Sequence, residues 1–318
     1  MPYSHHHSEI TELKQLFHEY LSDCRYTKQL SIKTIKSYGE VFSTFQKIMP
    51  EIKELSDLHP QILQEFFKRI STRKRIVGKK TVVGIKSSTI RTYYNKIIAF
   101  IRWLEYYNHI KEKLSSKMIQ PPTPKYEDER ALTDEEISKI IASITLYSRK
   151  NDFLYARDLV IISLLIYTGI RRGELLALRI SDIDFQTNTL FINGVTSKSK
   201  KSRYIPLHFS LLTQLKTYLK EREKRKSKCE MLIISSKADT PYTEYGIKCW
   251  VKKYVELSGV QFHLHRFRHA FACKLAKQNA DIVSIMNVMG HSTTRMTEQY
   301  LRSIKAENSR SFIQLMSF

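Results

Sequence analysis

The stretch LHRFRHAFACKLA concentrates cationic side chains at the start of an apolar helical pattern. His265, Arg266, Arg268 and His269 lie within five residues of the chain. Like charges this close repel one another, so we expect an anion among all four of them. His265 and Arg268 are three residues apart and therefore share one face of a helix.

Two further stretches carry side chains that could act on the same anion. In YTGIRRGELLALRISDID, an apolar helix is expected to end at Gly169, and Arg171 follows at once. Glu174 stands three residues after Arg171, where its carboxylate can hold the guanidinium in place. In MGHSTTRMTEQY, His291 precedes Tyr300 by nine residues. These stretches add a guanidinium, an imidazole and a phenol to the available chemistry.

A fourth stretch, TLFINGVTSKSKKSRYIPL at Thr189–Leu207, has two strand-like runs around a Ser/Lys-rich turn. This pattern predicts a β-hairpin with a cationic tip. Lys198 lies in that tip, eight residues before Pro206.

In chain order, Arg, Lys, His-x-x-Arg, His and Tyr resemble the catalytic set of the tyrosine recombinases, the integrases and Xer-type site-specific recombinases. TGIRRGE resembles the family's first arginine motif, HRFRH its His-x-Leu-Arg-His, and MGHS its Leu-Gly-His-Ser. Phe267, Ala270 and Met289 depart from the usual residues, but none of these changes removes a catalytic group. The resemblance extends to about Lys305 and assigns catalytic roles to Arg171, Lys198, His265, Arg268, His291 and Tyr300.

The resemblance implies DNA strand cleavage by covalent catalysis. Tyr300 would attack a backbone phosphorus, form a 3′-phosphotyrosyl link and free a 5′-hydroxyl. Because the covalent link conserves the bond energy, resealing needs no ATP, and no metal or other cofactor is expected. Arg171 and Arg268 would bracket the non-bridging oxygens with paired N–H donors.

The remaining groups take proton-transfer and supporting roles under the same resemblance. His265 would be the general base for Tyr300, and Lys198 the acid for the departing 5′-oxygen. His291 would hydrogen-bond the phosphate. Glu174 would orient the first arginine.

Composition agrees with a polyanionic partner. The 318 residues include 53 Lys and Arg against 31 Asp and Glu, a formal net charge of +22. Nucleic acid is the commonest partner of so basic a protein. Four cysteines without zinc-finger spacing suit a reducing cytosol, so we expect a cytoplasmic protein. The longest apolar run, LVIISLLIY, is half the length that a bilayer needs, so no membrane partner is expected.

The expected fold is mainly α with a small β-hairpin or sheet, in two domains. Residues 8–110 would form a helical core-binding domain, because apolar residues recur every three or four positions in its helices. Residues 111–130, with three prolines near their end, would be a linker. Residues 131–305 would form an α+β catalytic domain, entered by a helix that Thr133 and Glu136 cap. Residues 306–318 would be an apolar C-terminal tail helix.

One basic segment of the first domain, Thr72–Lys86, contains no acidic residue. Its two glycines favour a mobile loop, and its charge suits contact with a DNA phosphate backbone. The candidate DNA-binding residues are Arg73, Lys74, Arg75, Lys79, Lys80 and Lys86.

Other functions remain open at this point. A type IB topoisomerase uses similar chemistry to relax DNA, and a catalytically idle regulator would only bind it. The expected partner is double-stranded DNA with specific recombination sites, bound by a monomer that forms a homotetramer only in the synaptic complex. The short stretch before the first domain favours a simple recombinase of a mobile genetic element over an integrase with two DNA-binding modes.

Overall fold

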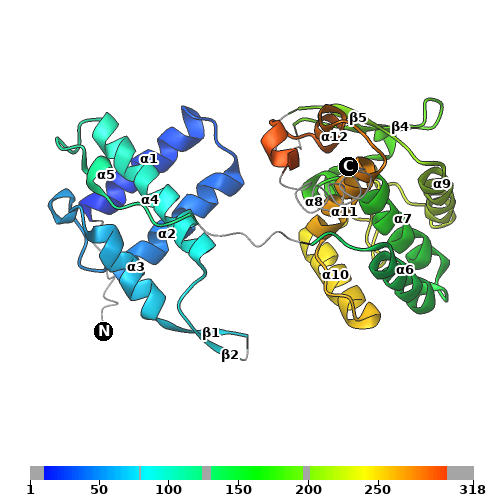
Figure 1. Cartoon of the computed structure of the whole chain (residues 1–318), viewed down its shortest axis with the longest axis horizontal. Helices are drawn as coiled ribbons and strands as arrows, with labels where there is room; N and C mark the ends of the chain where they lie inside the picture. The colour runs from blue at the N-terminus through cyan, green and yellow to red at the C-terminus, as the bar shows by residue number, and fades with distance from the viewer. Residues whose placement is uncertain (1–10, 79, 124–129, 196–200, 299–318) are drawn as a thin grey trace, which may run out of the picture. The chain divides into compact units, whose positions relative to one another are not determined.

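The computed structural model describes residues 11–78, 80–123, 130–195 and 201–298. The chain divides into two compact units, Met1–Tyr126 and Glu127–Phe318 (Figure 1). Helices dominate both units, and each contains one small antiparallel sheet. The predicted class, mainly α with a small β component, is confirmed. None of the helices in the described ranges is long and apolar enough to cross a membrane.

The first unit is a helical bundle built on the predicted apolar stripes. In the second helix, Phe42 and Phe45 are buried, and the following Met49 is fully covered. In the fourth helix, Ile97, Ile101 and others form the matching buried face. The helices of this unit are α1 Glu12–Tyr26, α2 Ile32–Ile48, the short 3₁₀ turn Leu55–Asp57, α3 Ile62–Thr72, α4 Ser87–Tyr106 and α5 Leu114–Lys117.

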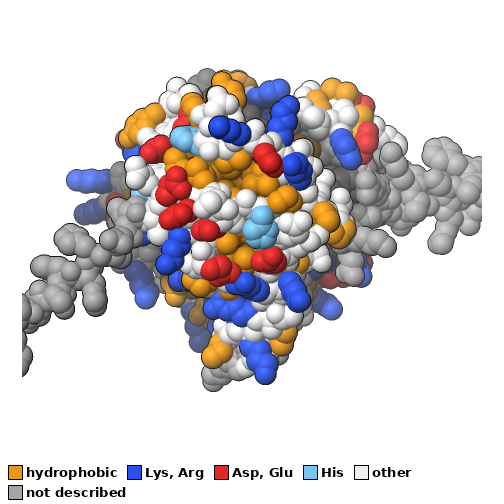
Figure 2. Space-filling model, turned by 90° about the vertical axis from the view of Figure 1, so that its left-hand side faces the viewer, with side chains coloured by type: hydrophobic (Ala, Val, Ile, Leu, Met, Phe, Trp, Pro, Cys, Tyr) orange, Lys and Arg blue, Asp and Glu red, His pale blue; other side chains and the backbone are white. Residues whose placement is uncertain are grey.

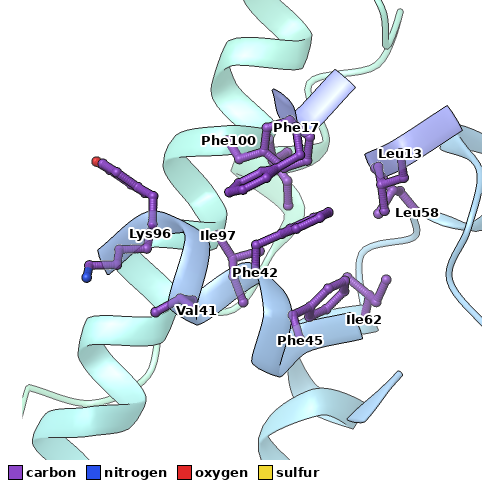
Figure 3. A pocket seen from close by; sticks show the side chains of 12 residues that line it. Leu13, Phe17, Val41, Phe42, Phe45, Leu58, Ile62, Lys96, Ile97 and Phe100 are labelled. Carbon is purple, nitrogen blue, oxygen red and sulfur yellow. The ribbon is translucent and has the colours of Figure 1, made fainter. Parts of the chain in front are cut away.

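Aromatic rings fill the centre of this bundle (Figure 3). Phe17 and Phe42 stack with ring centroids 3.7 Å apart, and Phe100 meets Phe17 edge-on at 5.1 Å. A residual cavity of about 20 Å³ lies among these rings, while Lys96 points away from them. A space of that size with an apolar lining holds at most one water molecule and tends to stay dry. It is a packing defect and offers no room for a ligand.

The basic segment after α3 is a β-hairpin, so the prediction of a mobile loop was wrong. Strands β1 Lys74–Val77 and β2 Lys80–Val83 pair antiparallel, and Val77 pairs with Lys80 across a two-residue turn. Gly78 supplies the positive φ of 63° that such a turn requires. The β-branched Ile, Val and Thr residues on both sides favour strands. The glycine that suggested mobility instead serves the turn.

The start of the predicted linker is also structured. Within residues 111–130, Leu114–Lys117 forms α5, and Leu114 and Met118 join the buried core of the first unit. Two apolar side chains spaced four apart explain this packing. The folded first unit therefore reaches at least Met118, beyond the predicted boundary at residue 110.

The second unit packs helices around one central, largely buried helix. That helix, α7 Asp152–Thr168, has apolar residues around most of its circumference and also contains the buried Arg157–Asp158 ion pair. It packs against α6, α9 and α11. A helix that is hydrophobic all round belongs in a protein interior. The other helices are α6 Asp134–Ser148, α8 Arg172–Ala177, the 3₁₀ turn Ile180–Asp182, α9 Phe209–Lys224, α10 Glu244–Ser258, α11 Leu264–Lys277 and α12 Ile282–Met289.

The predicted hairpin and helix cap are both present in this unit. Strands β4 Thr189–Ile192 and β5 Arg203–Pro206 pair antiparallel and form the predicted hairpin. A third strand, β3 Ile183–Asp184, pairs with β4; its two residues are too few to produce a recognisable strand pattern in the sequence. Thr133 and Glu136 form the reciprocal capping box at the start of α6, with bonds of 2.9 and 3.2 Å.

Candidate active site

The site begins where α7 ends. Gly169 closes the helix with a φ of 56°, and a Cβ at this position would lie 2.4 Å from a ring carbon of Phe271. Only glycine suits both the backbone angle and this contact. The tight approach places the Gly169 carbonyl 2.6 Å from Arg268 Nη1, and the chain then turns to start α8 at Arg171.

Glu174 binds two arginines at once. Its carboxylate accepts from Arg171 Nη1 at 3.0 Å and from the Arg171 backbone N–H at 2.9 Å. It also forms a two-point ion pair with Arg203, at 3.1 and 2.8 Å. Burial by itself would raise the pKa of Glu174, but hydrogen bonds from Arg203 and Arg171 and their charges outweigh it and lower the pKa to about 2. The carboxylate is therefore ionised at neutral pH.

Three arginines converge on the C-terminal end of α12. Arg203 Nε donates to the Val288 carbonyl at 2.7 Å, Arg268 Nη2 donates to the Met289 carbonyl, and Arg171 Nη2 donates to the Gly290 carbonyl at 2.8 Å. The last carbonyls of a helix lack partners within it and carry partial negative charge. The three guanidiniums satisfy them and thereby gather at one point, although they come from distant parts of the sequence.

His291 follows these carbonyls directly and is buried, with 5% of its surface exposed. Its Nδ1 lies 2.9 Å from the hydroxyl of Thr297, which is fully buried. Burial, followed by the positive charges of Arg268, Arg171, His265 and Arg203, lowers the pKa of His291 to about 3. The ring is therefore neutral at physiological pH and can donate from one nitrogen only.

His265 and Arg268 share α11, as their spacing predicts. Arg268 is buried with 2% exposure, whereas His265 is exposed. A positive charge on His265 would contribute to the lowered pKa of His291, so the two imidazoles lie within electrostatic range of each other.

Not all cations of this helix belong to the site, and the expectation that the four of them surround one anion was wrong in one respect. Arg266 forms an ion pair of 3.2 Å with Glu136 and donates to the Arg130 carbonyl at 3.0 Å. It fixes the start of α6 instead. Two residues on, Arg268 lies on a different side of the helix and reaches the site.

Lys198 and Tyr300 lie outside the described residues, as does Lys79 of the basic segment. Strands β4 and β5 are both described and flank the tip that contains Lys198. The tail of residues 306–318 also lies outside the described ranges.

Arg203 belongs to this site, yet no sequence pattern singled it out. The available signal was its place in the strand: Arg203 and Ile205 alternate with exposed residues, so an arginine occupies an inward position of β5. A buried arginine needs a charged partner, and Glu174 provides it.

The arrangement is suited to a phosphate group. Three guanidiniums carry more positive charge than the Glu174 carboxylate neutralises, and Arg171 retains 20% side-chain exposure toward solvent. Planar guanidiniums match the paired oxygens of a phosphate. Within the described part of the chain, no group of three or more His, Cys, Asp or Glu side chains is arranged to hold a metal ion.

Comparisons with known proteins agree with this interpretation. Residues 130–307 match the phage integrase family. A tyrosine recombinase of Agathobacter rectalis is 28% identical over 304 residues, covering 92% of each chain. The XerH site-specific recombinase bound to a palindromic difH substrate is 20% identical with a TM-score of 0.69, over 95% of this chain and 85% of that one. A lambda integrase tetramer bound to a Holliday junction is 19% identical with a TM-score of 0.65, over 89% and 78%.

Proposed function

Because the chain belongs to the phage integrase family and is a tyrosine-type, site-specific DNA recombinase, we propose that Tyr300 cuts the DNA strand while Arg171 and Arg268 hold the scissile phosphate. The observation that carries this assignment is the convergence of both guanidiniums on adjacent carbonyls, Gly290 and Met289. The cleavage yields a 3′-phosphotyrosyl link and a free 5′-hydroxyl, and the reverse attack on a new partner strand reseals the DNA.

The two arginines stabilise the transition state. A phosphorane carries extra negative charge on its non-bridging oxygens, and fixed donors aimed at those oxygens need no reorganisation during the reaction. Hydrogen bonds to backbone carbonyls and to Glu174 hold the guanidiniums in place before substrate arrives. Loss of one such donor typically costs on the order of 10²–10³ in rate.

His291 donates one hydrogen bond to the phosphate. Its ring is neutral, so if the Thr297 hydroxyl donates to Nδ1, the proton of the ring sits on Nε2 and points away from Thr297. That N–H supplies a third donor to the non-bridging oxygens without adding charge.

Proton transfer falls to His265 and Lys198. A tyrosine hydroxyl must lose its proton to attack and therefore needs a base. The exposed His265 acts electrostatically on His291, which supports its assignment to this role. The departing 5′-oxygen needs a proton, and Lys198 at the hairpin tip supplies it. Neither step requires a metal ion or ATP.

The first unit binds the DNA core site and the second unit acts on it. We assign the first unit to the core-binding domain, which extends from the predicted residues 8–110 to Met118 because Leu114 and Met118 join its core. The rest of residues 111–130 is the linker, and residues 131–305 form the catalytic domain. Double-stranded DNA with specific recombination sites is the substrate, which the family and the +22 charge support. The protein acts in the cytoplasm, where a mobile genetic element meets its host DNA.

Assembly depends on the tail. We propose that the protein is a monomer in solution and a homotetramer in the synaptic complex, as the lambda integrase is on a Holliday junction. The catalytic unit contains a groove of about 1380 Å³ whose apolar lining includes Ile137 and Ile141 of α6, Ile166 of α7 and Phe271 of α11. The apolar tail of a neighbouring subunit is the proposed occupant.

The other two functions are less well supported. The relatives are recombinases and not topoisomerases. An idle DNA-binding regulator would not need three arginines held together at the C-terminal end of α12.

A nicked suicide substrate tests the proposal. Wild-type protein should form a covalent adduct visible on a denaturing gel, in the presence of EDTA as well as without it. Tyr300→Phe should form none but bind DNA nearly as well, because only the nucleophilic oxygen is removed and affinity comes mostly from phosphate contacts. An adduct that persists in the variant would show that another tyrosine attacks.

A further inference from the structure

The β1–β2 ribbon exposes apolar side chains that the described part of its unit leaves uncovered. Ile76 is 80% exposed and Val83 is 61% exposed. We propose that this ribbon enters the major groove of the DNA, where Ile76 and Val83 contact base edges and so help to select the sequence. This inference rests on the proposed DNA-binding function of the first unit and goes beyond contact with the phosphate backbone.

The strand register defines the reading face. Lys74 pairs with Val83, and Ile76 pairs with Thr81. Directly paired residues, and residues two apart, project to the same side of a ribbon. Lys74, Ile76, Thr81 and Val83 therefore share one face, and all four are exposed. That face offers two apolar side chains, a hydroxyl and an ammonium group.

The ribbon is anchored at its base. The Gly84 N–H donates to the Arg73 carbonyl at 3.0 Å, and Arg75 Nε donates to the Gly84 carbonyl at 3.0 Å. An isolated two-stranded hairpin is marginally stable in water, so these bonds help to hold it ready for a partner. In Figure 1 the ribbon extends away from the helices of its unit.

Charge and shape together identify DNA as the partner. No acidic residue occurs from Thr72 to Lys86, among six basic ones, which favours a polyanion over a protein surface. Figure 2 shows that Lys and Arg side chains mix with hydrophobic ones toward the bottom of the face that it draws. The major groove is wide enough for a two-stranded ribbon, and apolar side chains there recognise the thymine methyl group. Phosphates lie on both walls of the groove, within reach of the flanking cations.

Strand preference alone does not explain the exposed Ile76 and Val83. Threonine is also β-branched and favours strands, yet it exposes a hydroxyl to water instead of a methyl group. The chain uses threonine at position 81 of the same face but not at these two positions. Threonine is therefore the appropriate replacement in a test, because it keeps the strand and removes apolar surface.

The experiment selects preferred duplexes from a randomised DNA library with the full chain. Affinity is then measured for the selected duplex and for a scrambled duplex of the same composition. Ile76→Thr with Val83→Thr should weaken binding to the selected duplex about tenfold, the effect typical of one mismatched base pair. Binding to the scrambled duplex and the salt dependence should not change. Ile32→Thr, at an 81% exposed position at the start of α2, is the matched control and should leave both affinities unchanged.

A chemical substitution in the DNA provides the second arm. Replacing thymidine with deoxyuridine in the selected duplex removes the C5 methyl groups. Where the substituted thymidines are the ones that the ribbon contacts, wild-type protein should bind the deoxyuridine duplex more weakly than the thymidine duplex, by a factor similar to that of the double variant. The double variant should bind the two duplexes equally well.

The outcomes separate the inference from the function on which it rests. Groove reading is overturned if the double variant keeps the wild-type preference for the selected duplex. It is also overturned if the variant fails only in synapsis of paired sites, and that result would assign the face to contact with a second subunit. Equal weakening on both duplexes also overturns it. A wild-type protein that selects no sequence would instead overturn the proposed site-specific binding, and groove reading with it.

Discussion

Arg203 and Glu174 form a buried two-point ion pair, with Nη1–Oε1 and Nη2–Oε2 distances of 3.1 and 2.8 Å. The same carboxylate holds Arg171 at 3.0 Å, so one acidic side chain fixes two of the three guanidiniums on α12. Arg203 comes from the strand that follows the Lys198 hairpin tip, and Arg171 directly precedes α8. Glu174 thereby joins strand β5 of the hairpin to Arg171.

Glu174→Gln should reduce both stability and activity. The amide keeps the shape of the side chain but not its charge. Because the Glu174 side chain is only 1% exposed, this change leaves two guanidiniums without their counter-ion in a buried site. Breaking a buried ion pair typically costs about 3–5 kcal/mol. Urea unfolding of the full chain and the rate of covalent adduct formation measure the two effects.

Glu244→Gln is the matched control, because Glu244 forms an exposed pair of 3.5 Å with the neighbouring Arg172. An exposed pair contributes at most about 1 kcal/mol, so this variant should resemble the wild type. Equal effects of the two substitutions would mean that the buried pair has no special role.

Lys198→Ala should fail on an ordinary phosphodiester but recover on a substrate with a 5′-bridging phosphorothiolate. A sulfur leaving group departs without a proton, so the acid is no longer needed. Arg171→Lys is the control and should not recover, because it acts on the non-bridging oxygens. If Lys198→Ala is equally defective on both substrates, the acid is another residue, and Lys200 and Lys201 are the next to test.

Much of this site could be predicted from the sequence, because its residues fall in short, ordered motifs. Gly169, Arg171 and Glu174 lie within six residues, and helical spacing placed His265 beside Arg268. Arg203 could not be found in this way, since its role depends on a carbonyl of α12 that is 85 residues away. Arg266 was misjudged for a related reason: its partner, Glu136, is 130 residues away on another helix.

The conformation of short segments was harder to predict where a glycine could end a helix, form a turn or belong to a loop. Gly169 ends a helix as expected, but Gly78 forms a strand turn in a segment predicted to be a loop. Glycine permits many backbone conformations, and only the pairing of the flanking residues chooses among them. The β-branched residues on both sides of Gly78 indicate that pairing, whereas the two glycines of the segment favour a loop.

Acidification should destabilise the catalytic unit through His291 before it affects Glu174. The folded-state pKa of His291 is about 3, against 6.5 in an unfolded chain, so its contribution is complete above pH 6.5 and is lost as pH falls toward 3. Glu174 has a folded pKa of about 2, against 4.5, so its contribution is lost only below about pH 4.5.

Urea unfolding at pH 7.5 and pH 5.5 isolates the histidine. Over this interval the wild type should lose on the order of 1 kcal/mol more than His291→Gln, because one pKa unit corresponds to about 1.4 kcal/mol. Parallel losses in the two proteins would show that His291 titrates normally and is not buried as described.

The cations around the ribbon should act through the DNA backbone. Arg73 and Lys86 are exposed and lie outside the two strands, so replacing them with glutamine should weaken binding to all duplexes alike. The log–log dependence of affinity on salt should flatten by roughly 0.9 for each DNA phosphate that is no longer neutralised. Arg75 is left intact, since it hydrogen-bonds the base of the ribbon. An unchanged salt slope would remove these residues from the DNA interface.

The tail AENSRSFIQLMSF should be required for synapsis but not for folding. Phe312, Ile313, Leu315, Met316 and Phe318 are apolar, and their spacing gives a helix one hydrophobic side. Burying five such side chains yields at most about 1.5–3 kcal/mol each, while association costs roughly 4–15 kcal/mol. The margin between these figures is thin, so we expect that the tail alone does not hold free subunits together and that paired DNA sites are needed to raise their effective concentration.

Analytical ultracentrifugation should show a monomer without DNA and a tetramer on paired sites. Deleting residues 311–318 should preserve the melting temperature and single-site binding while abolishing synapsis and strand exchange. A truncated chain that melts far below the full chain would place the tail on its own subunit, and one that recombines normally would show that the tail is dispensable.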